Sequence, residues 1–502
     1  MRDTADHEVS QHETGTETSI ATRAVQGSFY SIAASAVTLS LGFLRAVLLA
    51  RLLLPEHFGV VALALFYVNL VSRLRSLGLS SAMIHREEVD EQATETYLTI
   101  SLVLLAGGLL MLLGLAPLLS RFYPTMPTLG GVLIALAAVN ALAGLNAYPM
   151  TFLNRALAFR RLALADVTAS VAMTALAPLA ALAGWGPWSL VVEQAVGQVA
   201  RATVSWTSPM VPAPRLGWAQ SVARWLWTFG RRAWLGANLT FLIDRLDDLW
   251  IGTFLGKTPL GYYSRAYEFA RYPRRVIANP LTSVFFPTFA RFQRDRLRLS
   301  QAFYRVTSLM VRLGLWFGIT FALVAPEFIQ LILGKRWLPM LTTFQLMLLY
   351  TFADPLTVVT GNLLMATGHP DWVARARVVQ LAVFAPTVVG LGLWQGIEGV
   401  ALAADLMAVT GAVLLFAQTR RLVDYSLSAM WLWPTIALAV TGTATLGLSQ
   451  LWHSLPMWGG LLAKGMFISG VYGGVLWLAE REQLKTGWNL VREALRPAKG
   501  GL

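Results

Sequence analysis

The chain has 502 residues, of which 56% are hydrophobic and only 13% are charged, and its mean hydropathy is +0.56. A water-soluble protein of this length needs more charge to cover its surface, so these values indicate an integral membrane protein. The net charge of +13 would favour nucleic-acid binding in a soluble chain. Here the arginines gather in short connections between apolar runs, so membrane topology is the better explanation of the charge and we predict no nucleic-acid partner.

The chain begins with a polar stretch and continues as a series of apolar runs. Residues 1–24 have no apolar core of a signal peptide, so we predict a disordered cytoplasmic tail. Each later run is long enough to cross a bilayer, and hydrocarbon requires such a segment to be helical. The predicted fold is all-α, with about fourteen transmembrane helices of roughly 20 residues or more. They lie near 26–54, 57–84, 95–120, 128–149, 163–184, 187–208, 233–256, 259–290, 299–333, 339–367, 372–394, 397–418, 430–451 and 458–479.

The runs group into two lobes of six helices each, separated by a linker of different composition. The linker opens with prolines, and Trp218, Val222, Trp225 and Leu226 then fall on one helical face. This pattern is typical of an amphipathic helix in the membrane interface. The predicted domains are the tail 1–24, the N-lobe 25–208, the linker 209–232, the C-lobe 233–418, two further helices within 419–480 and a C-terminal tail 481–502.

Basic residues are distributed unequally between the two sides of the predicted bundle. The positive-inside rule makes the side richer in lysine and arginine cytoplasmic. Both termini are predicted on that side, with Arg481, Lys485, Arg492, Arg496 and Lys499 in the C-terminal tail. The opposite connections carry only Arg51, Arg121, Lys257, Lys335 and Arg336.

The two lobes are related by an internal repeat. Residues 49–64 align without gaps to residues 251–266 at a shift of 202, matching Gly59 to Gly261. Chance similarity of apolar segments is the alternative, and the gapless stretch around these glycines favours a true repeat. Six helices separate the copies, so both lobes enter the membrane the same way round. Parallel repeats of this kind pack about an axis along the membrane normal, with the substrate path between them.

Three segments of the chain resemble the polysaccharide transporter family. They are LDDLWIGTFLGKTPLGYYSRAYEFARYPRRVIANPLTSVFFPTFARFQRDRLRL (residues 246–299), FLRAVLLARLLLPEHFGVVALA near the N-terminus and LILGKRW (residues 331–337). That family contains exporters of lipid-linked repeat units and belongs to the multidrug, oligosaccharidyl-lipid and polysaccharide exporter superfamily. The resemblance runs from about Val25 to Gln418 and leaves the last two helices less diagnostic.

The resemblance implies a function. It predicts two lobes around a central cavity, which carry an undecaprenyl-pyrophosphate-linked oligosaccharide out across a bacterial inner membrane by alternating access. The implied partners are that lipid-linked saccharide, membrane lipids, a polysaccharide polymerase and glycosyltransferases.

Charged residues inside the predicted helices are candidate functional groups, since an intramembrane charge usually faces protein or a wet cavity. Arg45 in the first helix matches Asp247 in the seventh at the shift of 202. Asp244, Asp247 and Asp248 share one face of the seventh helix, and Arg245 points about 100° away from Asp244. We predict either a gate, in which Arg45 and Asp247 pair across the lobes until an anionic substrate competes, or a static buried pair. Coupling to a cation through these carboxylates is also open.

A second match joins Arg73 in the second helix to Arg275 in the eighth, with Arg271 and Arg75 close by. Guanidinium groups hold a pyrophosphate well, so we predict that arginines bind the headgroup shared by lipid-linked saccharides. The predicted substrate-binding residues are Arg73, Arg275, Arg271, Arg45 and Arg245. Snorkelling toward lipid headgroups is the alternative reading. Glu193 and Asp405 also match, at a shift of 212, and bonding between neighbouring helices explains them equally well.

Other functions are less compatible with the sequence. There is no cysteine, no nucleotide-binding loop, no catalytic-triad signature and no histidine spacing of a metal site, so we predict no cofactor, no metal and no enzyme activity. A polymerase or ligase needs a sizeable periplasmic loop, and every predicted one is short. A cation-coupled drug or metabolite antiporter of the same superfamily is the main alternative, and it should line its cavity with carboxylates instead of arginines.

Overall fold

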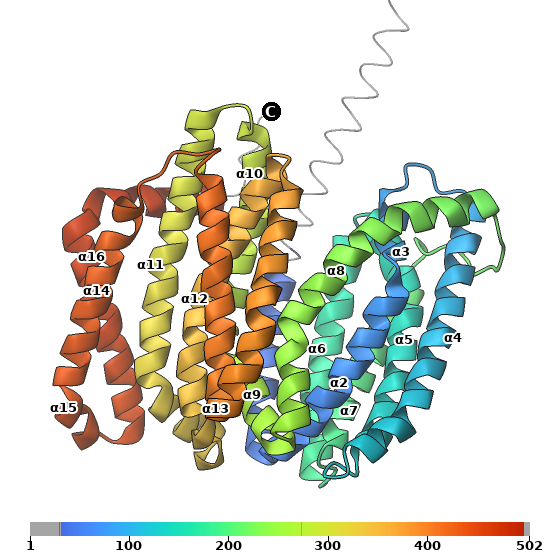
Figure 1. The fold of residues 1–502 in the computed structure, drawn as a ribbon, viewed down its shortest axis with the longest axis horizontal. Helices are drawn as coiled ribbons and strands as arrows, with labels where there is room; N and C mark the ends of the chain where they lie inside the picture. The colour runs from blue at the N-terminus through green and yellow to red at the C-terminus, as the bar shows by residue number, and fades with distance from the viewer. Residues whose placement is uncertain (1–29, 31, 273, 496–502) are drawn as a thin grey trace, which may run out of the picture. The chain divides into compact units, whose positions relative to one another are not determined.

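The computed structural model describes residues 30, 32–272 and 274–495 of the chain (Figure 1). The described residues form helices and connections without a strand, which confirms the predicted all-α membrane fold. Nine helices in this part of the chain are long and apolar enough to cross a membrane. The predicted tail 1–24 lies outside the described residues. The chain divides into two compact units, Met1–Phe241 and Leu242–Leu502.

The first unit contains seven complete helices and most of an eighth. They are Ile32–Leu52, α2 (Pro55–Ser76), α3 (Leu79–His85), α4 (Glu91–Phe122), α5 (Leu129–Arg155), α6 (Phe159–Leu182), α7 (Trp188–Trp206) and the beginning of α8 (Gln220–Phe254).

The second unit begins within α8 and contains the remaining elements. They are α9 (Lys257–Ala270), η1 (Arg274–Ala278), α10 (Asn279–Phe292), α11 (Arg296–Phe328), η2 (Ile329–Leu333), η3 (Lys335–Met340), α12 (Leu341–Ala366), α13 (Pro370–Thr419), α14 (Leu427–Gly447), α15 (Ser449–Ser454) and α16 (Met457–Leu495).

The helix predicted over 57–84 is broken into α2 and α3. Leu77 and Gly78 both adopt left-handed backbone conformations, with φ of 45° and 67°. A helix cannot continue through such residues, and the break leaves carbonyl groups of the last turn without helical partners. The indole nitrogen of Trp234 donates to the carbonyl oxygens of Arg73 and Leu74, each at 3.0 Å. The prediction of one continuous helix was wrong because α8 supplies these hydrogen bonds.

The helix predicted over 259–290 is broken as well. It ends at Ala270, and the chain continues through the π-helical turn η1 into α10. Pro280 is the second residue of α10. Proline is favoured in the first turn of a helix because its missing N–H needs no partner there, and it disfavours a continuous helix through the preceding residues. The second long helix of each repeat is therefore interrupted.

The linker region also differs from the prediction. A single helix, α8, runs from Gln220 to Phe254, whereas the sequence predicted a separate interfacial helix within 209–232 and a membrane helix from 233. No proline occurs between Arg215 and Thr258, so nothing in the sequence stops the helix. Two residues of the predicted lipid-facing stripe, Val222 and Leu226, are buried in an apolar cluster of the first unit. These two side chains pack against protein, while Trp218 of the same stripe is exposed.

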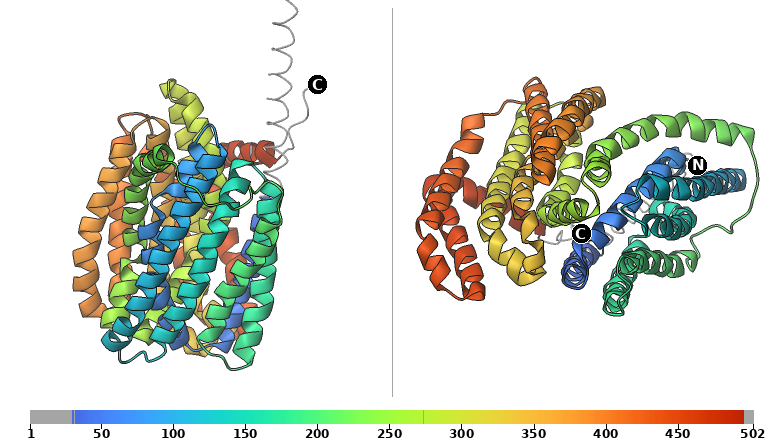
Figure 2. Two further views of the ribbon diagram at one scale, coloured as in Figure 1. Left: turned by 90° about the vertical axis from the view of Figure 1, so that its right-hand side faces the viewer. Right: turned by 60° about the horizontal axis from the view of Figure 1, so that its bottom comes forward.

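The predicted pair of helices 372–394 and 397–418 corresponds to α13, which bends at Gly396. Gly396 has a φ of 61° and a ψ of −135°, which favours glycine. The last helix, α16, also bends, at Glu480, and its final part turns away from its first part (Figure 2).

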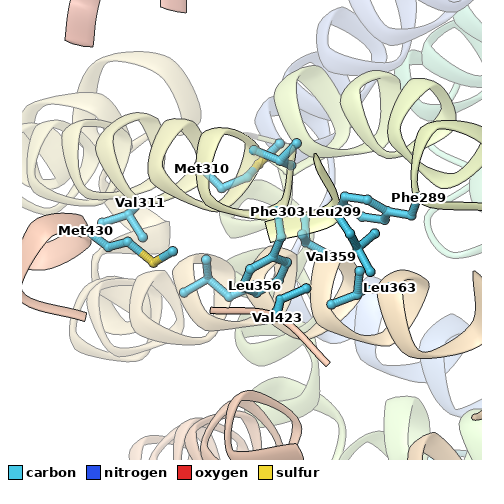
Figure 3. Packing of buried hydrophobic residues seen from close by; sticks show 11 residues of the cluster. Phe289, Leu299, Phe303, Met310, Val311, Leu356, Val359, Leu363, Val423 and Met430 are labelled. Carbon is cyan, nitrogen blue, oxygen red and sulfur yellow. The ribbon is translucent and has the colours of Figure 1, made fainter. Parts of the chain in front are cut away.

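The core of the second unit is an apolar cluster between α10, α11, α12 and α14. Phe289 and Phe303 are fully buried there, and Met310, Leu356 and Met430 pack around them (Figure 3). Close packing of these side chains stabilises the four helices against one another and holds α14 against α11 and α12.

Candidate substrate-binding site

Arg45 forms an ion pair inside the first unit. Its Nε donates to Oε1 of Glu193 on α7 at 2.8 Å, and its Nη1 donates to Oγ1 of Thr174 on α6 at 3.3 Å. Both charged side chains are only 15% exposed. Glu193 thus joins α7 to the helix Ile32–Leu52, and the sequence analysis named such bonding between neighbouring helices as an explanation of this residue. The predicted pairing of Arg45 with Asp247 joins different units and stays a prediction.

Asp247 and Asp248 lie side by side in the interior of the second unit, each 4% exposed. Asp247 accepts hydrogen bonds from the hydroxyl of Tyr263 at 2.6 Å and from the backbone N–H of Asp248 at 2.9 Å. Arg245 donates to Asp248 at 2.8 Å, which its position one turn earlier on α8 permits. Asp244 is partly buried one turn before these two carboxylates. Asp248 thus lies beside the guanidinium of Arg245, while Asp247 is held by neutral donors.

Arg271 and Arg275 lie at the break between α9 and α10, and each is placed over an aromatic ring. The guanidinium carbon of Arg271 is 4.9 Å from the ring centroid of Tyr267, and that of Arg275 is 5.4 Å from the centroid of Tyr272. Cation–π contacts of this length orient a guanidinium without neutralising its charge.

Arg73 lies on the last turn of α2, directly before the break at Leu77, and its side chain is exposed. The arginines matched by the repeat, Arg73 and Arg275, thus occur at the interrupted second helix of their respective units. Discontinuous helices mark substrate sites in many transporters, because irregular backbone is tolerated in a membrane mainly where it lines a cavity. The sequence identified the arginines and missed the breaks.

Within the described ranges, no group of three or more histidine, aspartate or glutamate side chains could hold a metal ion.

Comparison with known proteins places the chain in a family. A family model described as "Polysaccharide biosynthesis protein" matches residues 48–342, more than half of the chain. The chain belongs to this family. Residues of both repeats fall within the matched range, including Arg73 and Arg275.

Two relatives of this chain have names that refer to polysaccharide biosynthesis. The lipopolysaccharide biosynthesis protein WzxC of Escherichia coli (strain K12) is 24% identical over 410 residues, covering 79% of this chain and 81% of the relative. The succinoglycan biosynthesis transport protein ExoT of Rhizobium meliloti (strain 1021) is 30% identical over 324 residues, covering 61% of this chain and 62% of the relative.

Solved structures share the fold at low sequence identity. The lipid II flippase MurJ, in an inward closed conformation, has a TM-score of 0.73 at 13% identity, covering 92% of this chain and all of that one. An inward-facing multidrug resistance MATE family transporter of the MOP superfamily has a TM-score of 0.62 at 14% identity, covering 78% of this chain. The chain therefore has the fold of this transporter superfamily.

Proposed function

We propose that this protein is a flippase that moves a pyrophosphate-linked lipid saccharide across a bacterial inner membrane by alternating access of its two units. Membership of the polysaccharide biosynthesis family supports a saccharide substrate, and the relative named as a transport protein supports transport rather than catalysis. The fold shared with a lipid II flippase supports a lipid-linked form of that saccharide. A polymerase and glycosyltransferases acting on the same saccharide are the proposed partners.

The observation that carries the proposal is the pair of repeat-related arginines at the helix breaks. Arg73 ends α2 and Arg275 lies in η1, while Arg271 stands one turn before Arg275. A pyrophosphate is the anion common to lipid-linked saccharides, whereas the glycan itself is often neutral. Arginines that retain their charge in each unit suit that headgroup better than they suit a cationic drug.

The buried carboxylates of the second unit have a separate proposed role. Asp247 and Asp248, with Asp244 one turn away, form the site at which a coupling cation would bind. Arg45 and Asp247 are the proposed gate. In this gate Arg45 leaves Glu193 of its own unit and pairs with Asp247 of the other unit.

Binding of a pyrophosphate-linked lipid saccharide to the purified protein tests the headgroup assignment. Each charge-assisted contact contributes about 1.5–3 kcal/mol. Arg73→Gln and Arg275→Gln should therefore each weaken binding by roughly one to two orders of magnitude. Arg73→Lys and Arg275→Lys should weaken binding less than the glutamine variants do, because lysine keeps the positive charge and lacks only the bidentate geometry. The matched control is Arg121→Gln, an exposed arginine at the far end of α4.

A neutral lipid-linked sugar serves as the comparison ligand. If the glutamine variants lose affinity equally for both ligands, the arginines only shape the site and do not hold the pyrophosphate. Tight binding of a lipophilic cation, abolished by Asp247→Asn, would instead favour the antiporter function.

A further inference from the structure

Arg75 lies on the same helix as Arg73, but its environment is different. Arg73 is exposed, whereas Arg75 is half-buried among α2, α4 and α5 of the first unit. Two residues along a helix correspond to a rotation of about 200°, so the two side chains leave α2 on nearly opposite sides. Arg75 therefore does not belong to the headgroup site proposed for Arg73.

Two glycines make room for the guanidinium of Arg75. A β-carbon at Gly108 of α4 would lie 2.5 Å from Cδ of Arg75 and 3.3 Å from its Nε. A β-carbon at Gly144 of α5 would lie 3.0 Å and 3.2 Å from its two terminal nitrogens. Any larger residue at either place would collide with the arginine or displace it. The side chain occupies a niche that the absence of two side chains creates.

The positive charge in this niche has no counter-charge in the described part of the chain. Nε of Arg75 is enclosed and makes no hydrogen bond, and no carboxylate of the described residues pairs with the guanidinium. α5 contains no acidic residue, and the acidic residues of α4, Glu91 and Glu95, precede Gly108 by more than three helical turns. By contrast, two other arginines of this unit are paired, Arg45 with Glu193 and Arg201 with Asp166.

An uncompensated cation within a membrane-spanning helix is costly, and such residues usually mark a binding site. The half-buried state of Arg75 leaves the terminal nitrogens accessible, while Nε is enclosed. Arg75 is also the next-to-last residue of α2, near an end of that helix, where lipid phosphates are within reach of a long side chain.

We propose that the niche formed by Arg75, Gly108 and Gly144 is a second anion site, which binds the phosphate group of a lipid. The phosphate belongs either to a membrane phospholipid or to a pyrophosphate-bearing lipid. This site does not depend on the proposed flippase function, because a resident phospholipid would occupy it whether or not a saccharide is transported.

The experiment uses the full chain in an uncharged detergent and measures lipid binding by native mass spectrometry, together with the temperature of unfolding. The probes are short-chain phosphatidylglycerol, farnesyl pyrophosphate and an uncharged diacylglycerol. The variants are Arg75→Gln and Gly108→Ala, and Gly107→Ala is the matched control, since a β-carbon at Gly107 meets no atom within 4 Å.

Arg75→Gln should lose at least about ten-fold in affinity for a phosphate-bearing probe, and diacylglycerol binding should not change. Without a probe, Arg75→Gln should unfold no earlier than the native chain, because it leaves no carboxylate unpaired. Gly108→Ala should weaken phosphate binding although the charge is retained, and Gly107→Ala should bind as the native chain does.

Loss confined to phosphatidylglycerol would assign the site to membrane lipid, and loss confined to farnesyl pyrophosphate would assign it to a pyrophosphate-bearing lipid. Native affinity of Arg75→Gln for both probes overturns the proposal, as does equal weakening by Gly107→Ala and Gly108→Ala. If Arg75→Gln does not fold, the comparison of the two glycine variants decides. Failure here leaves the tests at Arg73 and Arg275 unaffected, so the two proposals fail separately.

Discussion

Arg45 and Asp247 are related by the repeat, yet each charge has a partner within its own unit. Arg45 pairs with Glu193 at 2.8 Å, and Asp247 accepts a hydrogen bond from Tyr263 at 2.6 Å. A static pair of Arg45 with Glu193, which is not the static pair with Asp247 that the sequence suggested, makes a different demand on Arg45 than a gate does. Such a static pair requires Glu193 alone, whereas a gate requires Arg45 to leave Glu193 during transport.

Charge exchange at Arg45 separates these two roles. Arg45→Ala leaves a mostly buried Glu193 without its guanidinium, which should cost about 3–5 kcal/mol of folding stability. The double variant Arg45→Glu, Glu193→Arg should restore the protein level in the membrane. If the gate exists, that variant should still export poorly, while Arg45→Asp with Asp247→Arg should regain part of the export. The measurements are membrane-protein level and polysaccharide export in cells.

Normal export by Arg45→Ala at a normal protein level would contradict both roles. Full export by the Glu193 exchange would assign Arg45 to a static pair and remove the gate. The same assay on Asp247→Ala should show loss of export, because the repeat places that carboxylate opposite in charge to Arg45 at the equivalent position.

At the scale of elements, the break between α2 and α3 is held by a close approach to α8. A β-carbon at Gly78 would lie 2.6 Å from the carbonyl oxygen of Gly230, and one at Gly230 would overlap the carbonyl oxygen of Leu77. Backbone-to-backbone contact of this kind requires glycine, because no side chain fits between the two helices. The contact places Trp234 where it can satisfy the carbonyls that the break exposes.

Gly230→Ala should therefore destabilise the first unit by about 1–3 kcal/mol, the usual cost of overpacking a close contact. Gly114→Ala is the control, since a β-carbon at Gly114 meets no atom within 4 Å and alanine is the better helix former. Thermal unfolding of both purified variants provides the comparison. Equal unfolding temperatures of the two variants would mean that α8 can move away from the break without loss of folding stability.

The last helix, α16, is attached to α11 by buried polar contacts. Arg312 of α11 donates to both carboxylate oxygens of Glu480 at 2.7 and 2.8 Å, and these side chains are 8% and 2% exposed. The hydroxyl of Tyr472 donates to the carbonyl oxygen of Arg312 at 3.0 Å. Lys464 pairs with Glu327 at 2.9 Å. Glu480 is also the residue at which α16 bends, so this pair lies at the bend.

Removing one member of the Arg312–Glu480 pair should destabilise the second unit more than removing both. Arg312→Met alone should cost about 3–5 kcal/mol because it leaves a buried carboxylate, while Arg312→Met with Glu480→Met should cost much less. The exposed pair of Arg296 and Asp424 is the control, and Arg296→Met should change the unfolding temperature little. A double variant less stable than the single one would contradict this expectation, because the carboxylate of Glu480 left without Arg312 would then not be costly.

At the scale of the whole molecule, the distribution of arginine predicts that both termini are cytoplasmic. The chain contains no cysteine, so single cysteines can be placed and labelled without a background signal. A cysteine at Leu502 should stay unlabelled by an impermeant reagent in intact cells, and one at Thr258, in the first turn of α9, should react. Labelling of position 502 from outside would reverse the assigned orientation.

The sequence alone determined the class of the protein and the candidate charges. Apolar runs of membrane-spanning length allow only helices, since hydrocarbon offers no other partner for the backbone, so the all-α membrane fold follows from composition and pattern. The repeat then singled out Arg45, Asp247, Arg73 and Arg275 by comparing equivalent positions, without any knowledge of packing. The resemblance to polysaccharide transporters was confirmed by the family match.

Only the tertiary structure decided which groups are partners and where helices stop. Arg45 and Glu193 are 148 residues apart, and Arg312 and Glu480 are 168 apart, so no local pattern connects them. The break at Leu77 depends on the approach of Gly230 and the hydrogen bonds of Trp234, both supplied by a distant helix. Helical periodicity indicates what one segment prefers, whereas helix breaks, ion pairs and the niche around Arg75 depend on the residues of neighbouring helices.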